Sequence, residues 1–244
     1  MIKRKESIEK GDGKKAAFRM RKRRKQMNRD LTVGEPQSVL WKFSIPMFVS
    51  VIFQQLYNMA DSVIAGKFAG EDALAAVGAS YPITMIFMAI AVGSNIGCSV
   101  IISQYFGAKW YEKMKTAIYT TLIASVALSL LLTAAGLLGS RAMMAAINTP
   151  ENIFADGALY LRIYIGGFVF LFLYNVATGI FNSMGDSRTP LYFLIGSSLG
   201  NIVLDLIFVA VFHWDVAGVA WATFIAQGIA CVLALLALRK RLAS

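Results

Sequence analysis

Two carboxylates differ from every other charge in the chain because apolar residues flank them on both sides. Asp205 ends NIVLD within LYFLIGSSLGNIVLDLIFVAVF, and Asp61 lies in QQLYNMADSVIAGKF. The remaining acidic residues fall in the N-terminal tail or near loops and helix ends. A charge near the centre of a bilayer costs about 2.5–3.5 kcal/mol, so such residues usually face a cavity or a partner and mark ion or proton paths. The alternative is a protonated aspartic acid that is hydrogen bonded across helices.

Neutral oxygen donors are predicted at the same depth as these two acids. Asn201 precedes Asp205 by four residues, so both side chains share one helical face. Asp205 and Thr223 each lie nine residues from Trp214, about 13 Å along antiparallel helices. Asp61 lies about 10 Å before the end of its own helix. We expect a nest of two carboxylates, an amide and a hydroxyl. Two carboxylates in a low dielectric resist double ionisation, so one should hold a proton unless a cation such as Na⁺ neutralises them.

A polar stripe precedes Asp61 on the first apolar segment. Gln54, Tyr57 and Asp61 recur at i, i+3 and i+7, which places them on one face of a helix. Pro46, upstream on the same segment, removes a backbone hydrogen bond and can hinge the helix, although a passive kink is the simpler interpretation. The stripe therefore predicts a polar surface inside the protein, on a helix that can bend.

Four further residues lie within apolar segments without a defined partner. The amides of Asn95 and Asn175 are interpreted either as hydrogen bonds between helices or as ligands of a bound molecule. The two cysteines, Cys98 and Cys231, are expected to be free, packed thiols.

The composition indicates the elements that must position these groups. The chain is 57% hydrophobic and 16% charged with a mean hydropathy of +0.59, which indicates a membrane protein. A spanning helix needs about 20 apolar residues. Six windows meet this requirement: 40–66, 76–105, 113–139, 155–183, 189–212 and 216–238. We predict an all-α membrane protein whose residues 31–244 form one bundle of six transmembrane helices.

The net charge of +10 lies mainly in a tail, because residues 1–42 hold 14 of the 24 Lys and Arg. Residues 1–30 lack the apolar core of a secretory signal and are expected to form a disordered cytoplasmic tail. RMRKRRK could instead bind RNA or anionic lipid, but we expect no nucleic-acid partner. Met20 and Met27 are alternative starts to Met1. With the N-terminus inside, the inner loops carry seven basic residues and the outer loops two, which favours a bundle with both ends inside.

The sequence was examined for two motifs that are typical of enzymes, and neither supports catalysis. GSSLG fits a hydrolase nucleophile elbow at Ser198, but the single histidine, His213, lies 15 residues on, about 22 Å along one helix. No phosphate-binding loop is present in the sequence. We therefore expect no enzyme and no cofactor. Small residues at G-x-x-x-G spacing predict close helix approach, at Gly66 with Gly70, Gly93 with Gly97, and Gly196 with Gly200.

Several segments together resemble the N-terminal lobe of the multidrug and toxic compound extrusion (MATE) transporters. They are DLTVGEPQSVLWKFSIPMF, QQLYNMADSVIAGKFAGEDALAAVGASYPI, SQYFGAK, NTPENI, NSMGDSRTPLYF, NIVLDLIFV and AGVAWATFIAQ, in the order of the family. The resemblance implies two six-helix lobes around a cavity that opens to alternate sides, and expulsion of cationic or amphipathic drugs in exchange for Na⁺ or H⁺. The cation-site positions of the family match Asp61, Asn201, Asp205 and Thr223. The bending proline matches Pro46, and cavity positions match Gln54, Tyr57 and Asn175.

The resemblance also implies a cellular membrane and a set of partners. We expect the chain in the inner cell membrane, with small-molecule drugs or organic cations, the lipid bilayer and a second lobe or second chain as partners. No metal is expected beyond Na⁺ at the cation site. A lipid-linked oligosaccharide flippase of the same superfamily is the alternative transporter, although such cavities tend to be rich in Lys and Arg and only Arg162 lies in an apolar window here. A non-transporting membrane subunit is the third interpretation.

Overall fold

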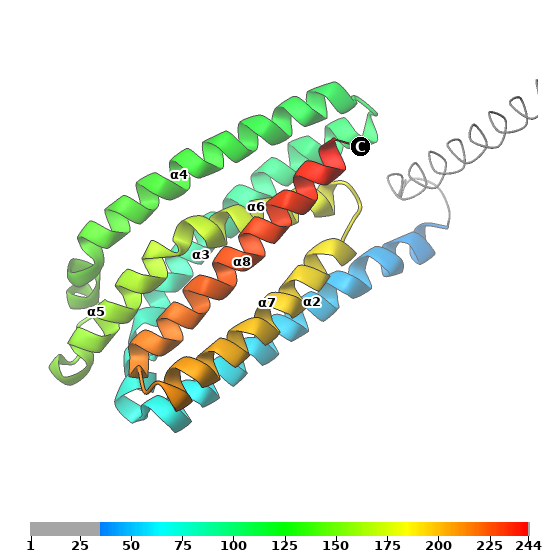
Figure 1. The fold of residues 1–244 in the computed structure, drawn as a ribbon. Coiled ribbons are helices and arrows are strands. Elements are labelled where there is room, and N and C mark those ends of the chain that lie inside the picture. Colours follow the sequence, from blue (N-terminus) through cyan, green and yellow to red (C-terminus); the bar gives the residue numbers. More distant parts are fainter. Residues whose placement is uncertain (1–34, 244) are drawn as a thin grey trace, which may run out of the picture. The chain divides into compact units, whose positions relative to one another are not determined.

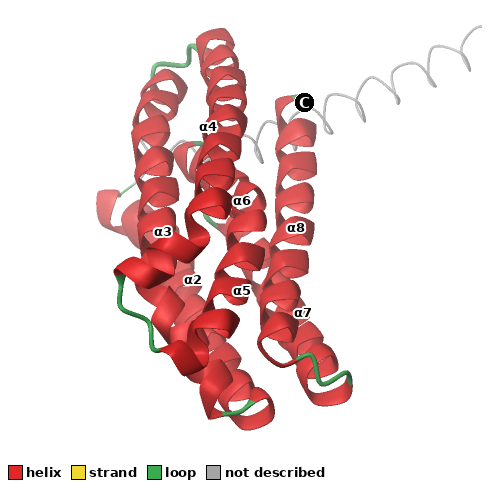
Figure 2. Ribbon diagram, turned by 90° about the vertical axis from the view of Figure 1, so that its left-hand side faces the viewer, coloured by secondary structure: helices red, strands yellow, loops and turns green. Residues whose placement is uncertain are grey.

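The computed structural model describes residues 35–243, and these are almost entirely helical (Figures 1 and 2). The tail predicted for residues 1–30 lies outside the described residues. The elements are α2 (Pro36–Ile64), η1 (Ala65–Ala69), α3 (Glu71–Gly107), α4 (Tyr111–Ala146), α5 (Glu151–Gly166), α6 (Phe168–Ser183), α7 (Arg188–Asp205), η2 (Leu206–Val211) and α8 (Asp215–Leu242). Among the described residues, five helices are long and apolar enough to cross a membrane, and the bent pair α5 and α6 passes the same test when the two helices are taken as one span. The prediction of an all-α membrane protein is confirmed.

Local sequence explains where several helices begin and end. Gly70 (φ 96°) separates η1 from α3, and Gly185 (φ 75°) separates α6 from α7; both adopt the left-handed region that glycine enters without steric cost. Glu71 and Asp72 lie in the first turn of α3, where negative charge complements the helix dipole. The last turn of α8 carries Arg239, Lys240 and Arg241, whose positive charge complements the C-terminal end of the helix dipole. These signals fix the loops between the spans.

The fourth span differs from its prediction. We predicted one continuous helix over residues 155–183, whereas the chain bends by 47° between α5 and α6. The break falls at Gly166 and Gly167, whose missing side chains remove steric support from the helix. A Cβ at Gly167 would lie 2.9 Å from Cδ2 of Phe224 on α8. The bend thus brings the backbone of the fourth span close to α8.

Two spans end in π-helical turns. The first span continues from α2 into η1, and the fifth continues from α7 into η2. Asp205 is the last residue of α7 and directly precedes η2. π-Helical turns are rare and occur often at functional sites, because the widened turn displaces side chains from their regular positions. The sequence windows placed these spans correctly but carried no sign of the wider turns.

The core of the bundle forms where α3, α5, α6 and α8 pack together. Phe168, Phe172 and Phe181 are fully buried there, and Phe87 meets Phe168 edge to face with ring centroids 5.0 Å apart. A second cluster, mostly of alanine and valine, joins η1, α3, α5, η2 and α8. This second cluster lies at the end of the bundle that holds the two carboxylates, and it fixes the ends of α2 and α7 against α8.

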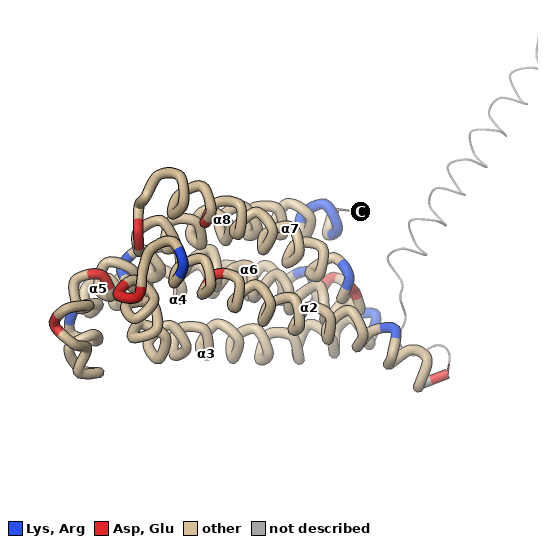
Figure 3. Tube along the Cα trace, turned by 90° about the horizontal axis from the view of Figure 1, so that it is seen from below, with Lys and Arg blue, Asp and Glu red and all other residues tan. Residues whose placement is uncertain are grey.

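Helix α2 is packed less tightly than the others. Among its described residues, only Pro46 and Ile64 are buried. Large apolar side chains on several helices point outward, among them Phe48 (72% exposed), Ile123 (72%) and Leu138 (89%). Charged residues gather near the helix ends and leave long uncharged stretches between them (Figure 3). Such a surface suits the hydrocarbon interior of a bilayer.

The predicted role of the G-x-x-x-G pairs is wrong for two of the three pairs. A Cβ at Gly93, Gly97, Gly196 or Gly200 would meet no atom within 4 Å, so no helix of residues 35–243 packs on these positions. Gly66 does lie against Leu74, at 3.1 Å. Close helix contacts instead occur at single glycines outside the motif: Gly136, Gly157, Gly167 and Gly179. Spacing along one helix cannot show which face its neighbour covers.

Candidate functional site

The two isolated carboxylates meet between α2 and α7. Asp205 is completely buried and Asp61 is half-buried, and their carboxyl groups lie within hydrogen-bonding distance of each other. Each keeps one buried oxygen, Oδ1, without a hydrogen-bond partner among the described residues. A hydrogen bond between two carboxyl groups requires one proton, and a cation between them would satisfy both unpaired oxygens. The pair can therefore hold one small positive ion.

Asn201 links Asp205 on α7 to the backbone of Thr223 on α8. With the Asn201 amide oriented to suit both neighbours, its nitrogen donates to Oδ2 of Asp205 at 2.9 Å and its oxygen accepts from the backbone N–H of Thr223 at 3.1 Å. Both residues are buried, at 1% and 8% exposed. The depth estimate from the sequence thus brings together residues of α7 and α8 that contact each other. The amide oxygen is already engaged, so it reaches an ion only after the amide turns.

Two tyrosines lie near the carboxyl pair, and a third stacks on one of them. Tyr57 lies near Asp61 and is hydrogen bonded to the side chain of Thr223. Tyr160 on α5 is close enough to Asp61 and Asp205 for their charges to interact, and its ring stacks on Tyr164 with centroids 6.2 Å apart. Tyr160 and Tyr164 were not predicted, although their i, i+4 spacing in an apolar window places both rings on one helical face.

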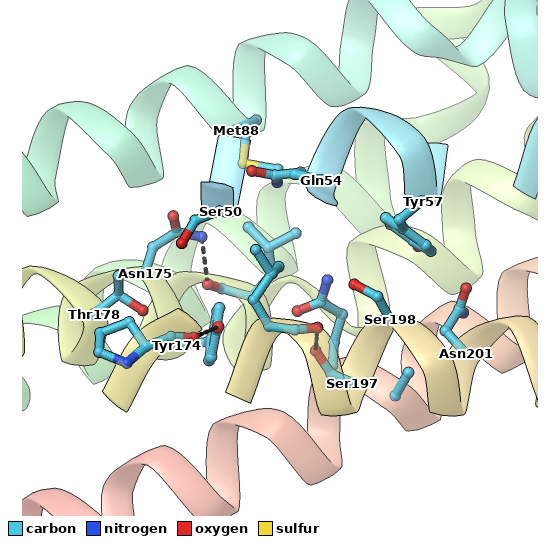
Figure 4. A pocket seen from close by; sticks show the side chains of 15 residues that line it. Ser50, Gln54, Tyr57, Met88, Tyr174, Asn175, Thr178, Ser197, Ser198 and Asn201 are labelled. Atoms are coloured by element: carbon cyan, nitrogen blue, oxygen red, sulfur yellow. Dashed lines mark hydrogen bonds between the residues drawn. The ribbon is translucent and has the colours of Figure 1, made fainter. Parts of the chain in front are cut away.

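A cavity of about 140 Å³ lies beside the carboxyl pair, between α2, α6, α7 and α8, with Met88 of α3 at its wall. The predicted residues Gln54, Tyr57 and Asn175 all line it. Figure 4 shows Gln54 and Tyr57 on α2 across from Ser198 and Asn201 on α7. Other polar lining residues were not predicted: Ser50, Tyr174, Thr178, Ser197, Ser198 and Gln227. The lining is polar but contains no charged residue among those described.

Asn201 and Tyr57 belong to both the carboxyl cluster and the cavity wall. Asn201 contacts Asp205 and Thr223, and Tyr57 contacts Thr223 and lies near Asp61, yet both line the cavity. A molecule in the cavity that displaces either side chain must therefore disturb the partners of the acids. The carboxyl pair and the cavity therefore share a wall of two side chains.

The predicted hinge lies where α2 meets the α6–α7 loop. Pro46 is buried inside α2, which continues through it as one helix. Because proline lacks an N–H, the carbonyl four residues earlier has no regular helical donor. One residue further on, the Phe43 carbonyl accepts a hydrogen bond from the hydroxyl of Ser187, at 3.1 Å. The α6–α7 loop thus binds α2 one residue from the carbonyl that lacks a helical donor.

The remaining amides behave differently from each other. Asn95 lies against Gly179 of α6 and accepts a hydrogen bond from Ser99 at 3.0 Å, in keeping with a contact between helices. Asn175 donates to the Leu171 carbonyl of its own helix at 2.9 Å and still lines the cavity. The cysteines Cys98 and Cys231 are free, as expected.

The matches to known proteins include the region of the chain that holds Asp61 and Asp205. The MatE family model matches residues 46–207. The Bacillus subtilis proteins named Probable multidrug resistance protein YoeA and YpnP are 31% and 32% identical over 203 and 201 residues, which is 82% of this chain and 44% and 45% of theirs. An outward-facing multidrug resistance MATE family transporter of the MOP superfamily superimposes with a TM-score of 0.82 at 27% identity, covering 87% of this chain and 47% of that chain.

The chain spans about half the length of the curated relatives it matches. The family model covers both predicted acids and most of the first five spans, and the structural likeness extends over most of the described bundle. Members of this family are membrane transporters rather than enzymes. The chain belongs to the MatE family of multidrug and toxic compound extrusion transporters.

Proposed function

We propose that the chain forms the N-terminal lobe of a secondary active efflux transporter, which exchanges cationic or amphipathic drugs for Na⁺ or H⁺. The observation that carries the proposal is the shared wall: Asn201 and Tyr57 contact the carboxyl cluster and also line the cavity. An antiporter needs this arrangement, because ion binding and cargo binding must exclude each other. The names of YoeA and YpnP, both multidrug resistance proteins, support the cargo class.

The ion step rests on the pairing of Asp61 with Asp205. Two unit charges about 4 Å apart repel by about 4 kcal/mol at an effective dielectric of 20. A proton shared between the carboxyl groups removes this repulsion directly. Na⁺ would take ligands from both carboxylates and from the hydroxyl of Thr223, with the amide of Asn201 turning to add its oxygen. Both ions suit the donor set, and the turn of the amide is required only for Na⁺.

The coupling step moves α2. When the ion leaves, the two carboxylates repel, and α2 is the element that yields because few of its residues are buried. Bending near Pro46 would shift Gln54 and Tyr57 along the cavity wall. Cargo that enters the widened cavity then keeps the acids apart until an ion returns. Ion and cargo alternate on the same lobe in this scheme.

The size of the cavity indicates that another element completes it. Sites for drug-sized molecules usually measure about 300–1,000 Å³, whereas this cavity measures about 140 Å³. We therefore infer that a second six-helix lobe, or a second copy of the chain, supplies the rest of the cargo site. The excess of basic residues in the predicted inner loops supports a bundle with both ends in the cytoplasm, in the inner cell membrane.

The flippase alternative is less well supported. Pyrophosphate-linked cargo needs cationic partners, and no Lys or Arg lines the cavity among the described residues. Arg162 is exposed on α5 and lies outside the cavity lining. A non-transporting subunit would need neither the unpaired carboxyl oxygens nor the polar cavity, and ligand binding decides between these interpretations.

The test is a linkage measurement on the purified chain in lipid nanodiscs. Ethidium binding is followed by fluorescence anisotropy while Na⁺ or pH is varied. We expect Na⁺ or acidification to weaken ethidium binding at least fivefold, the lower end of typical coupling between two sites. Potassium at matched ionic strength controls for screening. Ethidium binding that ignores both ions would contradict the proposed antiport. Na⁺ binding without ethidium binding would show that the cargo site requires the second lobe, and binding of neither would favour the non-transporting subunit.

A further inference from the structure

A second hollow is lined by residues of α3 and α4 alone and so lies apart from the carboxyl cluster. Figure 2 shows these two helices side by side and the turn that joins them. It is a groove of about 520 Å³ that shares no lining residue with the cavity. The two helices pack through Ile102, Met114 and Ile118, and the groove runs beside this contact. Long side chains line its mouth, whereas most of the other lining side chains are short: Gly97, Cys98, Thr116, Ala117, Thr120 and Thr121. A Cβ at Gly97 would meet nothing within 4 Å.

The mouth of the groove is basic and aromatic. Lys113 lines it and holds its Nζ 4.4 Å from the centroid of the Trp110 ring. Glu112 also lines the mouth, but it is 91% exposed and pairs with Lys115 at 3.6 Å. With Lys109 in the connecting turn, this end of α3 and α4 carries three lysines against one glutamate. The local charge therefore favours an anion.

The length and depth of the groove fit a lipid. Lys113 and Thr120 are seven residues apart, a rise of about 10 Å from the helix end toward the membrane centre. Tyr105 and Trp110, whose rings lie 6.2 Å apart, flank the mouth, and such aromatic side chains mark the level of the headgroups. A ligand here needs a negative head beside Lys113 and an apolar chain along α3 and α4.

We propose that this groove binds an anionic phospholipid, with the phosphate against Lys113 and one acyl chain between α3 and α4. Basic pockets between transmembrane helices recognise anionic headgroups in this way. A zwitterionic lipid fits the same shape but gains less from the lysine. A free anion gains from the lysine but leaves the groove below unfilled. The site is separate from the carboxyl cluster and does not depend on the proposed antiport.

Quenching of Trp110 tests the proposal in nanodiscs. The other three tryptophans are replaced by phenylalanine, and the nanodisc lipid is titrated with phosphatidylglycerol or phosphatidylcholine brominated on the upper acyl chain. Because one lysine near an anionic headgroup favours binding about fivefold, we expect half-maximal quenching at an about fivefold lower fraction of phosphatidylglycerol. Equal quenching by the two lipids would overturn the proposal.

Matched variants separate the lysine from general surface charge. Lys113→Gln should abolish the difference between the lipids and Lys113→Arg should keep it. Lys67→Gln is the control, because Lys67 also lies over an aromatic ring, Phe68 at 5.7 Å, but on a different turn. Loss of the preference in Lys67→Gln as well, or its survival in Lys113→Gln, would contradict a site at Lys113.

Three further measurements distinguish a lipid from an anion and guard against misfolding. Glycerol phosphate, which carries the headgroup chemistry without acyl chains, should not relieve the quenching; relief would show an anion site and overturn the lipid assignment. Gly97→Leu should reduce the preference by filling the groove. In the chain with all four tryptophans, phosphatidylglycerol should raise the unfolding temperature above that in phosphatidylcholine, and Lys113→Gln should remove the increase. No shift in that chain would contradict the proposal.

Discussion

Replacing Asp205 by asparagine tests the ion step. The substitution is nearly isosteric, and the new side chain keeps an oxygen where Oδ2 of Asp205 now accepts from Asn201 at 2.9 Å. It removes one of two adjacent carboxylates in a fully buried position. Removing one of two adjacent carboxylates also removes the repulsion between them when both are ionised. We expect Asp205→Asn to insert and fold as the unaltered chain does.

The ion affinity of the pair should change by a large factor. With one carboxylate gone, the repulsion of about 4 kcal/mol that an ion relieves at an effective dielectric of 20 no longer exists. This energy corresponds to a loss of up to about a thousandfold in affinity for the coupling ion. Ethidium binding to Asp205→Asn should therefore lose its dependence on Na⁺ and pH, while the affinity itself persists.

The assay compares Asp205→Asn with Asp215→Asn in nanodiscs. Asp215 is exposed at the start of α8, so its substitution makes the same chemical change away from the acids. Ethidium anisotropy is measured across Na⁺ concentration and pH for both variants. Ion-dependent binding of unchanged strength in Asp205→Asn would refute the role of the carboxyl pair, provided that Asp215→Asn behaves as the unaltered chain.

Three further substitutions test the packing around the site. Asn201→Ala removes the donor to Asp205 and the acceptor for the Thr223 N–H, so thermal unfolding in detergent should show a loss of about 1–3 kcal/mol; an unchanged midpoint would argue against these bonds. Gly167→Ala places a Cβ 2.9 Å from Phe224 and should destabilise by about 1–3 kcal/mol, whereas Gly196→Ala, with open space around it, should be neutral or stabilise by up to about 1 kcal/mol; equal effects would contradict the bend contact. Asp186→Ala removes the ion pair with Arg241 and the bonds to Thr189, and its unfolding midpoint should fall below that of Glu151→Ala, an exposed acid at another helix start.

The positions of the spans and the depth of the acids could be predicted because both depend on simple distances. Apolar length fixes a span, and the rise per residue placed Asp205 and Thr223 at one level. The i, i+4 spacing likewise placed Asn201 beside Asp205, where the structure has it. These relations are local or nearly so, and the sequence alone determines them.

Features that depend on a neighbouring helix could not be predicted in the same way. The backbone at Gly167 lies close to the ring of Phe224, which belongs to a different helix. The open faces at Gly93 and Gly196 show that small residues permit a close approach but do not cause one. The position of Tyr160 near Asp61 and Asp205 could not be predicted, because it depends on α5 passing beside the carboxyl pair. Tertiary packing decides each of these points.

The state of the carboxyl pair can be observed directly by infrared difference spectroscopy of the chain in nanodiscs without Na⁺. We predict the absorption band of one protonated carboxylic acid, and we expect this band to disappear when ethidium binds. The band should be missing from the Asp61→Asn, Asp205→Asn double variant. A carboxylic acid band that ethidium leaves unchanged, or one that persists in the double variant, would contradict the central claim that Asp61 and Asp205 exchange an ion for cargo.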